Sequence, residues 1–90
     1  MPRQLKHRSR LEIISSILEV TNGNRVKRTE IQYKTYLSNN LLTEYLVQLL
    51  QCDLIEYIEG ERAFKTTPKG MQVLQTYNKM DELLVRTHLV

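Results

Sequence analysis

The chain has 90 residues, of which 41% are hydrophobic and 26% charged, with a formal net charge of +3, so we expect one small globular domain and exclude disordered and fibrous classes. No hydrophobic run approaches the roughly 20 residues of a transmembrane helix, and the basic N-terminus leads into no apolar segment typical of a secretory signal. The single cysteine, Cys52, cannot form an internal disulfide, which favours a reducing, cytoplasmic location.

Two helices are predicted in the first third of the chain. Ser9 and Glu12 have the spacing of a capping box, and hydrophobic residues at helical spacing follow until an Asn-Gly pair, so the first helix is expected at about 9–21. A more polar second helix is expected at about 27–35. Its inward residues are expected to be Ile31 and Leu37.

The third helix has the clearest amphipathic pattern in the chain. Ser38 is a good N-cap, and the helix is expected to end near Cys52. Its hydrophobic residues recur at i, i+3, i+4, i+7 and i+8, which is one face of an α-helix. They are Leu42, Tyr45, Leu46, Leu49 and Leu50.

The remaining third predicts a β-hairpin and a fourth helix. Residues 54–58 and 63–66 are rich in strand formers and flank a turn that contains a glycine. Thr67 then offers an N-cap directly before Pro68, at the first position of a helix that extends to about Leu84 or further.

This order of elements predicts a winged helix-turn-helix. The fold class is α+β and mostly α, with a three-helix core, a β-hairpin wing and a C-terminal fourth helix. We divide the chain into a basic N-terminal arm (1–8), a DNA-binding domain (9–67) and a C-terminal helix that is a dimerisation element (68–90).

The residue runs at 27–38, 44–50, 54–57 and 64–70 resemble a small archaeal winged helix-turn-helix family, which includes ArnR-like transcription regulators and small dimeric DNA-binding proteins. The resemblance covers about residues 8–84. Its most specific element is Ile31-x-Tyr33 followed by Leu37-Ser38. It implies binding to DNA, at an operator or with tolerance of sequence, often as a dimer through the C-terminal helix. The chain departs from the family in having Asn39 where an aromatic residue is usual, and Gln51-Cys52-Asp53 where a glycine is common.

Positive charge is concentrated near the N-terminus. Residues 1–10 carry four basic residues and no acid, and residues 22–38 carry four basic residues and one acid, whereas residues 39–62 carry five acids and one arginine. Segregated positive charge suits a polyanion such as DNA. An ordinary solvated surface is the alternative that charge alone leaves open.

The outward face of the third helix is the candidate for reading bases, because the first turns of a recognition helix reach base edges in the major groove. Asn pairs with adenine, Thr contacts a thymine methyl group and Glu accepts from cytosine. A merely polar surface is the alternative. The base-facing candidates are Asn39, Asn40, Thr43, Glu44 and Val47.

The third helix contains no Lys or Arg, so phosphate contacts are expected from other segments. Tyr33 either donates to a phosphate or faces inward, and the arm is either a DNA contact or a solubilising tail. We expect no deep insertion of the wing, because Glu59 and Glu61 at its tip repel phosphate. The phosphate candidates are Arg8, Arg10, Arg25, Lys27, Arg28, Tyr33, Lys34, Ser38 and Lys65.

The fourth helix has hydrophobic residues at coiled-coil spacing, which favours a homodimer, although packing on its own domain competes for the same residues. They are Val73, Tyr77, Met80 and Leu84. No catalytic, metal or cofactor motif is present, so we predict neither an enzyme nor a small-molecule ligand, and we expect Cys52, with no cation nearby, to be structural. The alternative function is a protein-interaction module that uses the fourth helix and the acidic hairpin.

Overall fold

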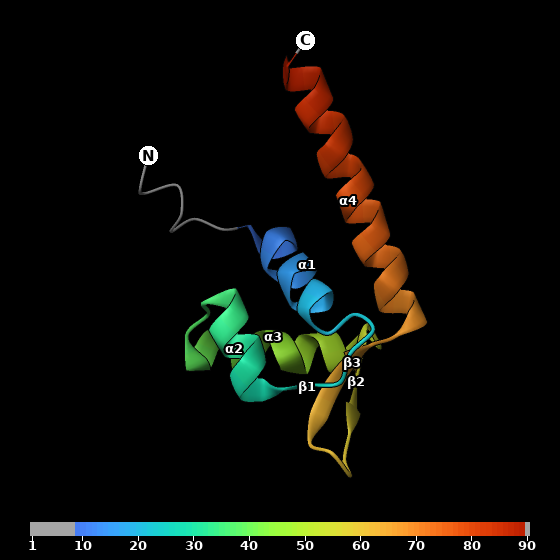
Figure 1. Cartoon of the computed structure of the whole chain (residues 1–90). Coiled ribbons are helices and arrows are strands. Elements are labelled where there is room, and N and C mark those ends of the chain that lie inside the picture. The colour runs from blue at the N-terminus through green and yellow to red at the C-terminus, as the bar shows by residue number, and fades with distance from the viewer. Residues whose placement is uncertain (1–8, 90) are drawn as a thin grey trace.

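The computed structural model describes residues 9–89, with side chains described up to residue 84, so the predicted arm with Arg8 lies outside the described residues. Four helices gather at one end of a small antiparallel sheet, and a β-hairpin extends away from them (Figure 1). In chain order the elements are α1 (Arg10–Val20), β1 (Val26–Lys27), α2 (Arg28–Thr35), α3 (Asn39–Gln51), β2 (Ile55–Ile58), β3 (Ala63–Thr66) and α4 (Pro68–Leu89). The predicted order of helix, helix, turn, helix, hairpin and helix is confirmed.

The predicted helix starts are confirmed by their hydrogen bonds. The Ser9 Oγ accepts the backbone N–H of Glu12 at 3.0 Å, and the Glu12 carboxylate accepts the N–H of Ser9 at 2.9 Å, which completes the capping box. The hydroxyl groups of Ser38 and Thr67 each accept an N–H from the first turn of α3 and α4, at 3.2 and 3.0 Å. Local sequence signals therefore set where these three helices begin.

The sheet has one strand more than expected. Val26–Lys27 forms β1, which pairs with β3 and gives the strand order β1-β3-β2. The second helix, expected at about 27–35, is confirmed at Arg28–Thr35, and the strand directly before it was not expected. A strand of two residues has no periodicity to detect, and Val26 becomes extended because it is buried opposite Phe64 of the neighbouring strand.

The core lies between α1, α2, α3 and the sheet. Ile31 and Leu37 are buried as expected, and so is the face of α3 except for Leu50, which is half-buried at its edge. From α4 the core receives Leu74, which is 4% exposed, while Val73 is half-buried. The stripe predicted on α4 is therefore not the line that packs deepest. The fully buried large side chains include Ile17, Leu18, Ile31, Leu42, Leu49 and Ile55.

Two buried threonines join the end of α1 to β3. The Thr66 Oγ1 donates to the carbonyl of Leu18 at 2.8 Å and lies 2.7 Å from the Thr21 Oγ1. The Thr66 backbone N–H also donates to the Thr21 carbonyl at 2.9 Å. These bonds hold the β2–β3 hairpin, which we call the wing (Ile55–Thr66), in a fixed direction relative to the helices (Figure 1).

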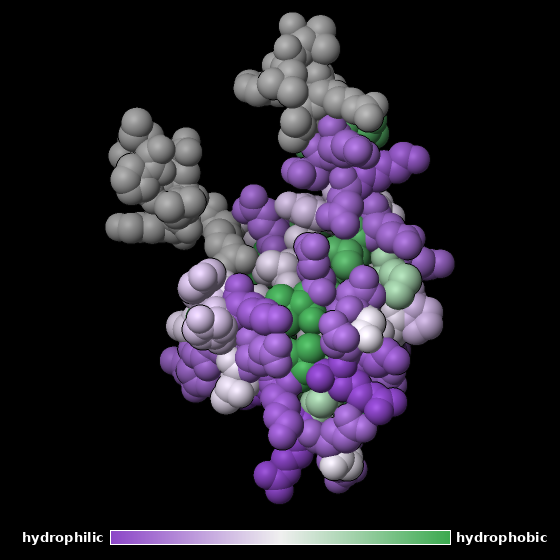
Figure 2. Space-filling view, in the orientation of Figure 1, coloured by the Kyte–Doolittle hydropathy of each residue, from purple (hydrophilic) through white to green (hydrophobic). Residues whose placement is uncertain are grey.

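The surface seen in this orientation is mostly hydrophilic, with hydrophobic side chains in a few patches near its middle (Figure 2). Such isolated patches are normal for a small domain. The exposed large hydrophobic residues lie on several elements, and those on α4 are Met71, Met80, Leu83 and Leu84.

Candidate nucleic-acid interface

A strip of α3 faces away from the core along the whole helix. At about 100° per residue, Asn40, Glu44, Val47 and Gln51 fall on one side, roughly opposite Tyr45 and Leu49 of the buried face. All four are exposed, and Val47 is 46% exposed. We call these four residues the α3 strip. Neither the wing nor any other described element covers it, so its polar groups are accessible to a partner. Gln51 was not among the predicted base-facing residues.

One flank of the strip carries the guanidinium of Arg28. Its Nη2 donates to the carbonyl and to the Oδ1 of Asn39, at 3.0 and 2.7 Å, and to the Thr43 hydroxyl. Asn39 and Thr43, both predicted to face bases, are thereby bound to a residue predicted to contact phosphate. Arg28, at the start of α2, thus places a positive charge beside α3, which contains no Lys or Arg. Arg28 is half-buried, and it locks α2 to the first turns of α3.

The opposite flank carries a second guanidinium, from α1. Arg10 lies 5.5 Å from the centre of the Tyr45 ring, in cation–π geometry, and its Nη2 donates to the Gln48 Oε1 at 2.7 Å. The structure holds the exposed charge of Arg10, a predicted phosphate contact, beside α3, so that arginines from α1 and α2 lie on either side of the α3 strip.

The wing adjoins the Arg28 flank. A shallow hollow there is lined by Arg28, Leu50, Tyr57, Arg62 and Phe64. The Tyr57 and Phe64 rings are 5.1 Å apart and tilted by 51°, and they form its aromatic wall. The hollow thus joins two guanidinium groups, one from α2 and one from the wing, across an apolar floor.

Two predicted phosphate residues form surface ion pairs. Arg25 lies 2.8 Å from Glu61 of the wing, and Lys34 lies 3.1 Å from Glu30 one turn earlier on α2. Because all four side chains are about half exposed, each pair adds little stability and can exchange for a phosphate. Lys27, on β1, is exposed and makes no ion pair with any residue in the described range.

Two tyrosines at the end of α2 project into solvent. Tyr33 is 78% exposed, so the alternative that it faces inward was wrong. Tyr36 is 88% exposed and was missed altogether. It caps the C-terminus of α2 in the left-handed conformation, with φ of 60°, immediately before Leu37 and Ser38 lead into α3. The hydrophobic pattern gave no signal for it, since exposed and buried tyrosines look alike in sequence.

Lys65 and Cys52 lie apart from this arrangement. Lys65 is half-buried opposite Glu56 in the β2–β3 register, on the sheet face away from Tyr57 and Phe64, because side chains alternate along a strand. Cys52 is exposed rather than packed, and the Lys69 ammonium donates to its carbonyl at 2.9 Å. The expectation that Cys52 packs as a small structural residue was therefore wrong, and the ammonium contact is to its backbone carbonyl.

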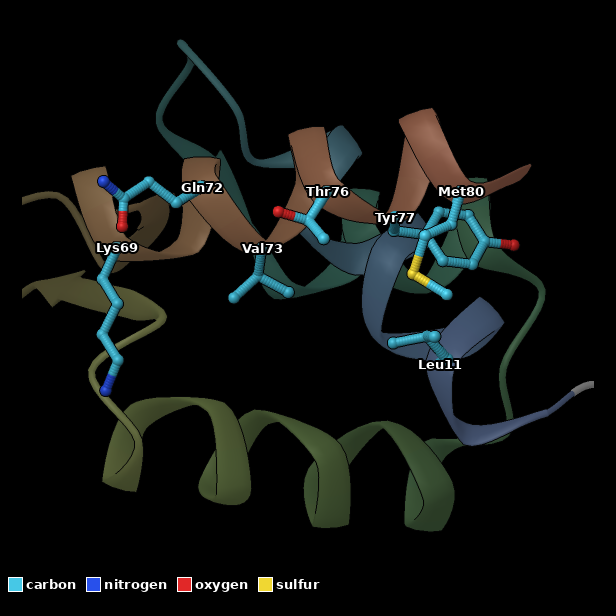
Figure 3. A pocket seen from close by; sticks show the side chains of 7 residues that line it. All are labelled: Leu11, Lys69, Gln72, Val73, Thr76, Tyr77 and Met80. Atoms are coloured by element: carbon cyan, nitrogen blue, oxygen red, sulfur yellow. The ribbon is translucent and has the colours of Figure 1, made fainter. Parts of the chain in front are cut away.

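A groove runs along α4 where that helix passes α1 (Figure 3). Leu11 of α1 approaches Tyr77 and Met80 at one end, and Val73 points into the opening from α4. Val73 and Tyr77 are half-buried, whereas Met80 and Leu84 are 49% and 65% exposed. Of the predicted stripe, Val73, Tyr77 and Met80 therefore line the groove next to α1, and Leu84 lies further along α4.

Within residues 9–84, no group of three His, Cys, Asp or Glu side chains is placed to hold a metal ion. None of the helices in residues 9–89 is long and apolar enough to span a membrane.

Comparisons with known proteins agree with this architecture. The sequence model of a family described as "winged helix-turn-helix" matches residues 7–85, which is nearly the whole chain. No curated protein matches the chain.

Proposed function

Since the chain belongs to the winged helix-turn-helix family, we propose that it binds double-stranded DNA with α3 in the major groove. The observation that carries this proposal is the uncovered α3 strip between two guanidinium groups, those of Arg28 and Arg10. An α-helix fits the major groove of B-form DNA, and a helix that is exposed along its length offers its side chains to base edges there.

Base recognition and phosphate binding are assigned to different residues. Asn40 is exposed in the first turns of α3 and makes none of the hydrogen bonds that engage Asn39, so its amide is available to pair with adenine. Lys27, Lys34 and Arg25 neutralise phosphates beside the groove, because each is exposed and at most weakly paired. Tyr33, in the last turn of α2, and Ser38, the N-cap of α3, add hydroxyl contacts to the DNA backbone.

We further propose that two copies associate through α4. Met80 lines the far end of the groove and is half exposed, and the exposed Leu83 and Leu84 follow it along α4, so a second copy would cover all three. A dimer presents two α3 helices to two half-sites, as is common for helix-turn-helix proteins. The resemblance to archaeal regulators and chromosomal proteins supports a role in transcription control or DNA organisation in the cytoplasm.

Binding measurements on duplex DNA separate phosphate contacts from base recognition. Fluorescence anisotropy over a salt series gives the slope of log affinity against log salt, which is about −0.9 for each phosphate that is neutralised. The double variant Lys27→Ala and Lys34→Ala is expected to weaken binding to every duplex by a similar factor and to flatten the slope by about two phosphates' worth. We avoid Arg28→Ala in this test, since it also removes the bonds to Asn39 and Thr43.

Asn40→Ala is expected to change the preference among a panel of duplexes while leaving the salt slope as in the parent. Lys79→Ala is the control for the lysine variants, because it removes one exposed positive charge from α4 and not from the segments that flank α3. Absence of binding by the parent at about 50 mM salt would overturn the proposal. If Asn40→Ala keeps the parent's preference, α3 is not the reading helix.

The dimer is tested by light scattering coupled to size-exclusion chromatography. The parent is expected to elute with twice the mass of one chain, and Leu84→Glu is expected to elute as a monomer, because it places a charge in the proposed contact. Gln75→Glu, which adds the same charge at another exposed position of α4, should keep the parent's mass. A monomeric parent would refute association through α4.

A further inference from the structure

Three non-glycine residues in the described part of the chain adopt the left-handed conformation: Tyr36, Asp53 and Arg62, with φ of 60°, 60° and 52°. This conformation is unfavourable for residues with a Cβ atom and is tolerated best by Asn and Asp. Asp53 is therefore an ordinary occupant of such a position. Tyr36 and Arg62 are not, and glycine would be less strained at both.

Neither side chain is retained for contacts within its own chain. Tyr36 is 88% exposed, so the ring is not packed in the core. Arg62 is exposed, and its guanidinium makes no hydrogen bond or ion pair with another residue in the range 9–84. A strained backbone that carries an unpacked side chain indicates that the side chain is needed by something outside the domain.

The two residues lie next to different parts of α3. Tyr36 precedes its N-terminus by three positions, in the turn from α2, and Arg62 lines the hollow that the wing forms with Arg28 and with Leu50 near the C-terminus of α3. Both therefore border the helix that we propose to read bases. A phenol hydroxyl and a guanidinium are both groups that bind phosphate oxygens.

We propose that Tyr36 and Arg62 bind the DNA backbone on either side of the groove entered by α3, and that the left-handed conformation of each aims its side chain at a phosphate. This inference rests on the proposed function. The backbone strain at Tyr36 and Arg62 is then tolerated because it directs these two side chains toward DNA. A residue in the right-handed conformation would point its side chain in another direction.

The proposal predicts opposite effects on stability and affinity, which a purely structural role would not produce. Tyr36→Gly and Arg62→Gly are each expected to raise the midpoint of thermal unfolding by about 4 °C or more, because glycine relieves the strain. Each is also expected to weaken binding to all duplexes by about tenfold or more at low salt, the loss of one hydrogen bond to a charged group. Arg62→Gly should flatten the salt slope by about 0.9, whereas Tyr36→Gly should leave the slope unchanged.

Asp53→Gly is the matched control. It replaces the third left-handed residue, which is exposed and acidic and therefore repels phosphate, so it is not expected to weaken binding. Tyr36→Phe keeps the ring and removes the hydroxyl, and it should lose as much affinity as Tyr36→Gly without the gain in stability.

Circular dichroism melts and anisotropy titrations of the four variants decide the outcome. If the glycine variants are more stable but bind DNA as the parent does, while Lys27→Ala with Lys34→Ala still weakens binding, the inference is wrong and the two side chains serve another surface, such as a protein contact. If the parent itself binds no duplex, the proposed function is wrong, and the inference that rests on it is wrong with it. This outcome is distinguished from the previous one because it is seen in the parent and not only in the variants.

Discussion

Gly70, in the first turn of α4, is the position where the local and the tertiary expectations have opposite signs. Inside a helix, Gly→Ala stabilises by about 1 kcal/mol, because alanine has the higher helix propensity. In the folded chain, however, a Cβ atom on Gly70 would overlap the carbonyl oxygen of Leu54 and lie 2.8 Å from the Thr66 Cγ2. We therefore expect Gly70→Ala to destabilise the domain.

The magnitude follows from what must move. Relief of the overlap shifts α4 away from the start of β2 and lengthens two bonds of Thr67, from its N–H to the Leu54 carbonyl (3.1 Å) and from its hydroxyl to the Asp53 carbonyl (2.6 Å). Overpacking costs about 1–3 kcal/mol, and each weakened hydrogen bond about 1 kcal/mol. After the gain in propensity is subtracted, the net loss is about 2–4 kcal/mol, or a fall of about 10 °C or more in the unfolding midpoint.

The assay is urea unfolding followed by circular dichroism, at one protein concentration because of the proposed dimer. Gly60→Ala is the control, since no atom lies within 4 Å of its added Cβ, and its free energy of unfolding should stay within about 0.5 kcal/mol of the parent. A Gly70→Ala variant as stable as the parent, or more stable, would refute the close approach of α4 to β2.

Two further predictions concern the wing. Thr66→Val keeps the side-chain shape but removes the hydroxyl that bonds to α1 and Thr21, and it should lower the free energy of unfolding by about 1–3 kcal/mol in the same urea assay. The exposed Thr76→Val should be close to neutral, and equal stability of the two variants would contradict the buried network. Glu61→Gln removes the carboxylate that pairs with Arg25, so the guanidinium is no longer paired and can bind a phosphate. Duplex affinity at low salt should then rise, because Glu61 no longer competes with a phosphate for Arg25, and an unchanged affinity in anisotropy titrations would show that Arg25 does not contact DNA.

Most of the helical architecture was predictable because its signals are local. The capping residues Ser9, Ser38 and Thr67 mark helix starts through bonds that span three residues of sequence. The apolar face of α3 follows from spacing alone. β1 was missed because two residues carry no period, and Val26 is extended only because β3 lies beside it.

The candidate site was predictable in outline and not in its partners. The outward residues of α3 follow from helical geometry, as Asn40 and Val47 illustrate. The bond from Arg28 to Asn39 spans 11 residues and that from Arg10 to Gln48 spans 38, and no local pattern announces such pairs. The exposure of Tyr36 and the position of Lys65 on the far face of the sheet likewise depend on how elements pack.

By itself, the order of residues determined which segments are helices, where they begin and which side of α3 turns inward, since hydrogen bonds and hydrophobic spacing within one element decide these features. Tertiary contacts alone decided that two arginines from separate helices flank the outward side of α3, that a third strand joins the wing, and that Gly70 tolerates no side chain. Each of those depends on atoms brought together from distant parts of the chain, where the distance in space is unrelated to the distance in sequence.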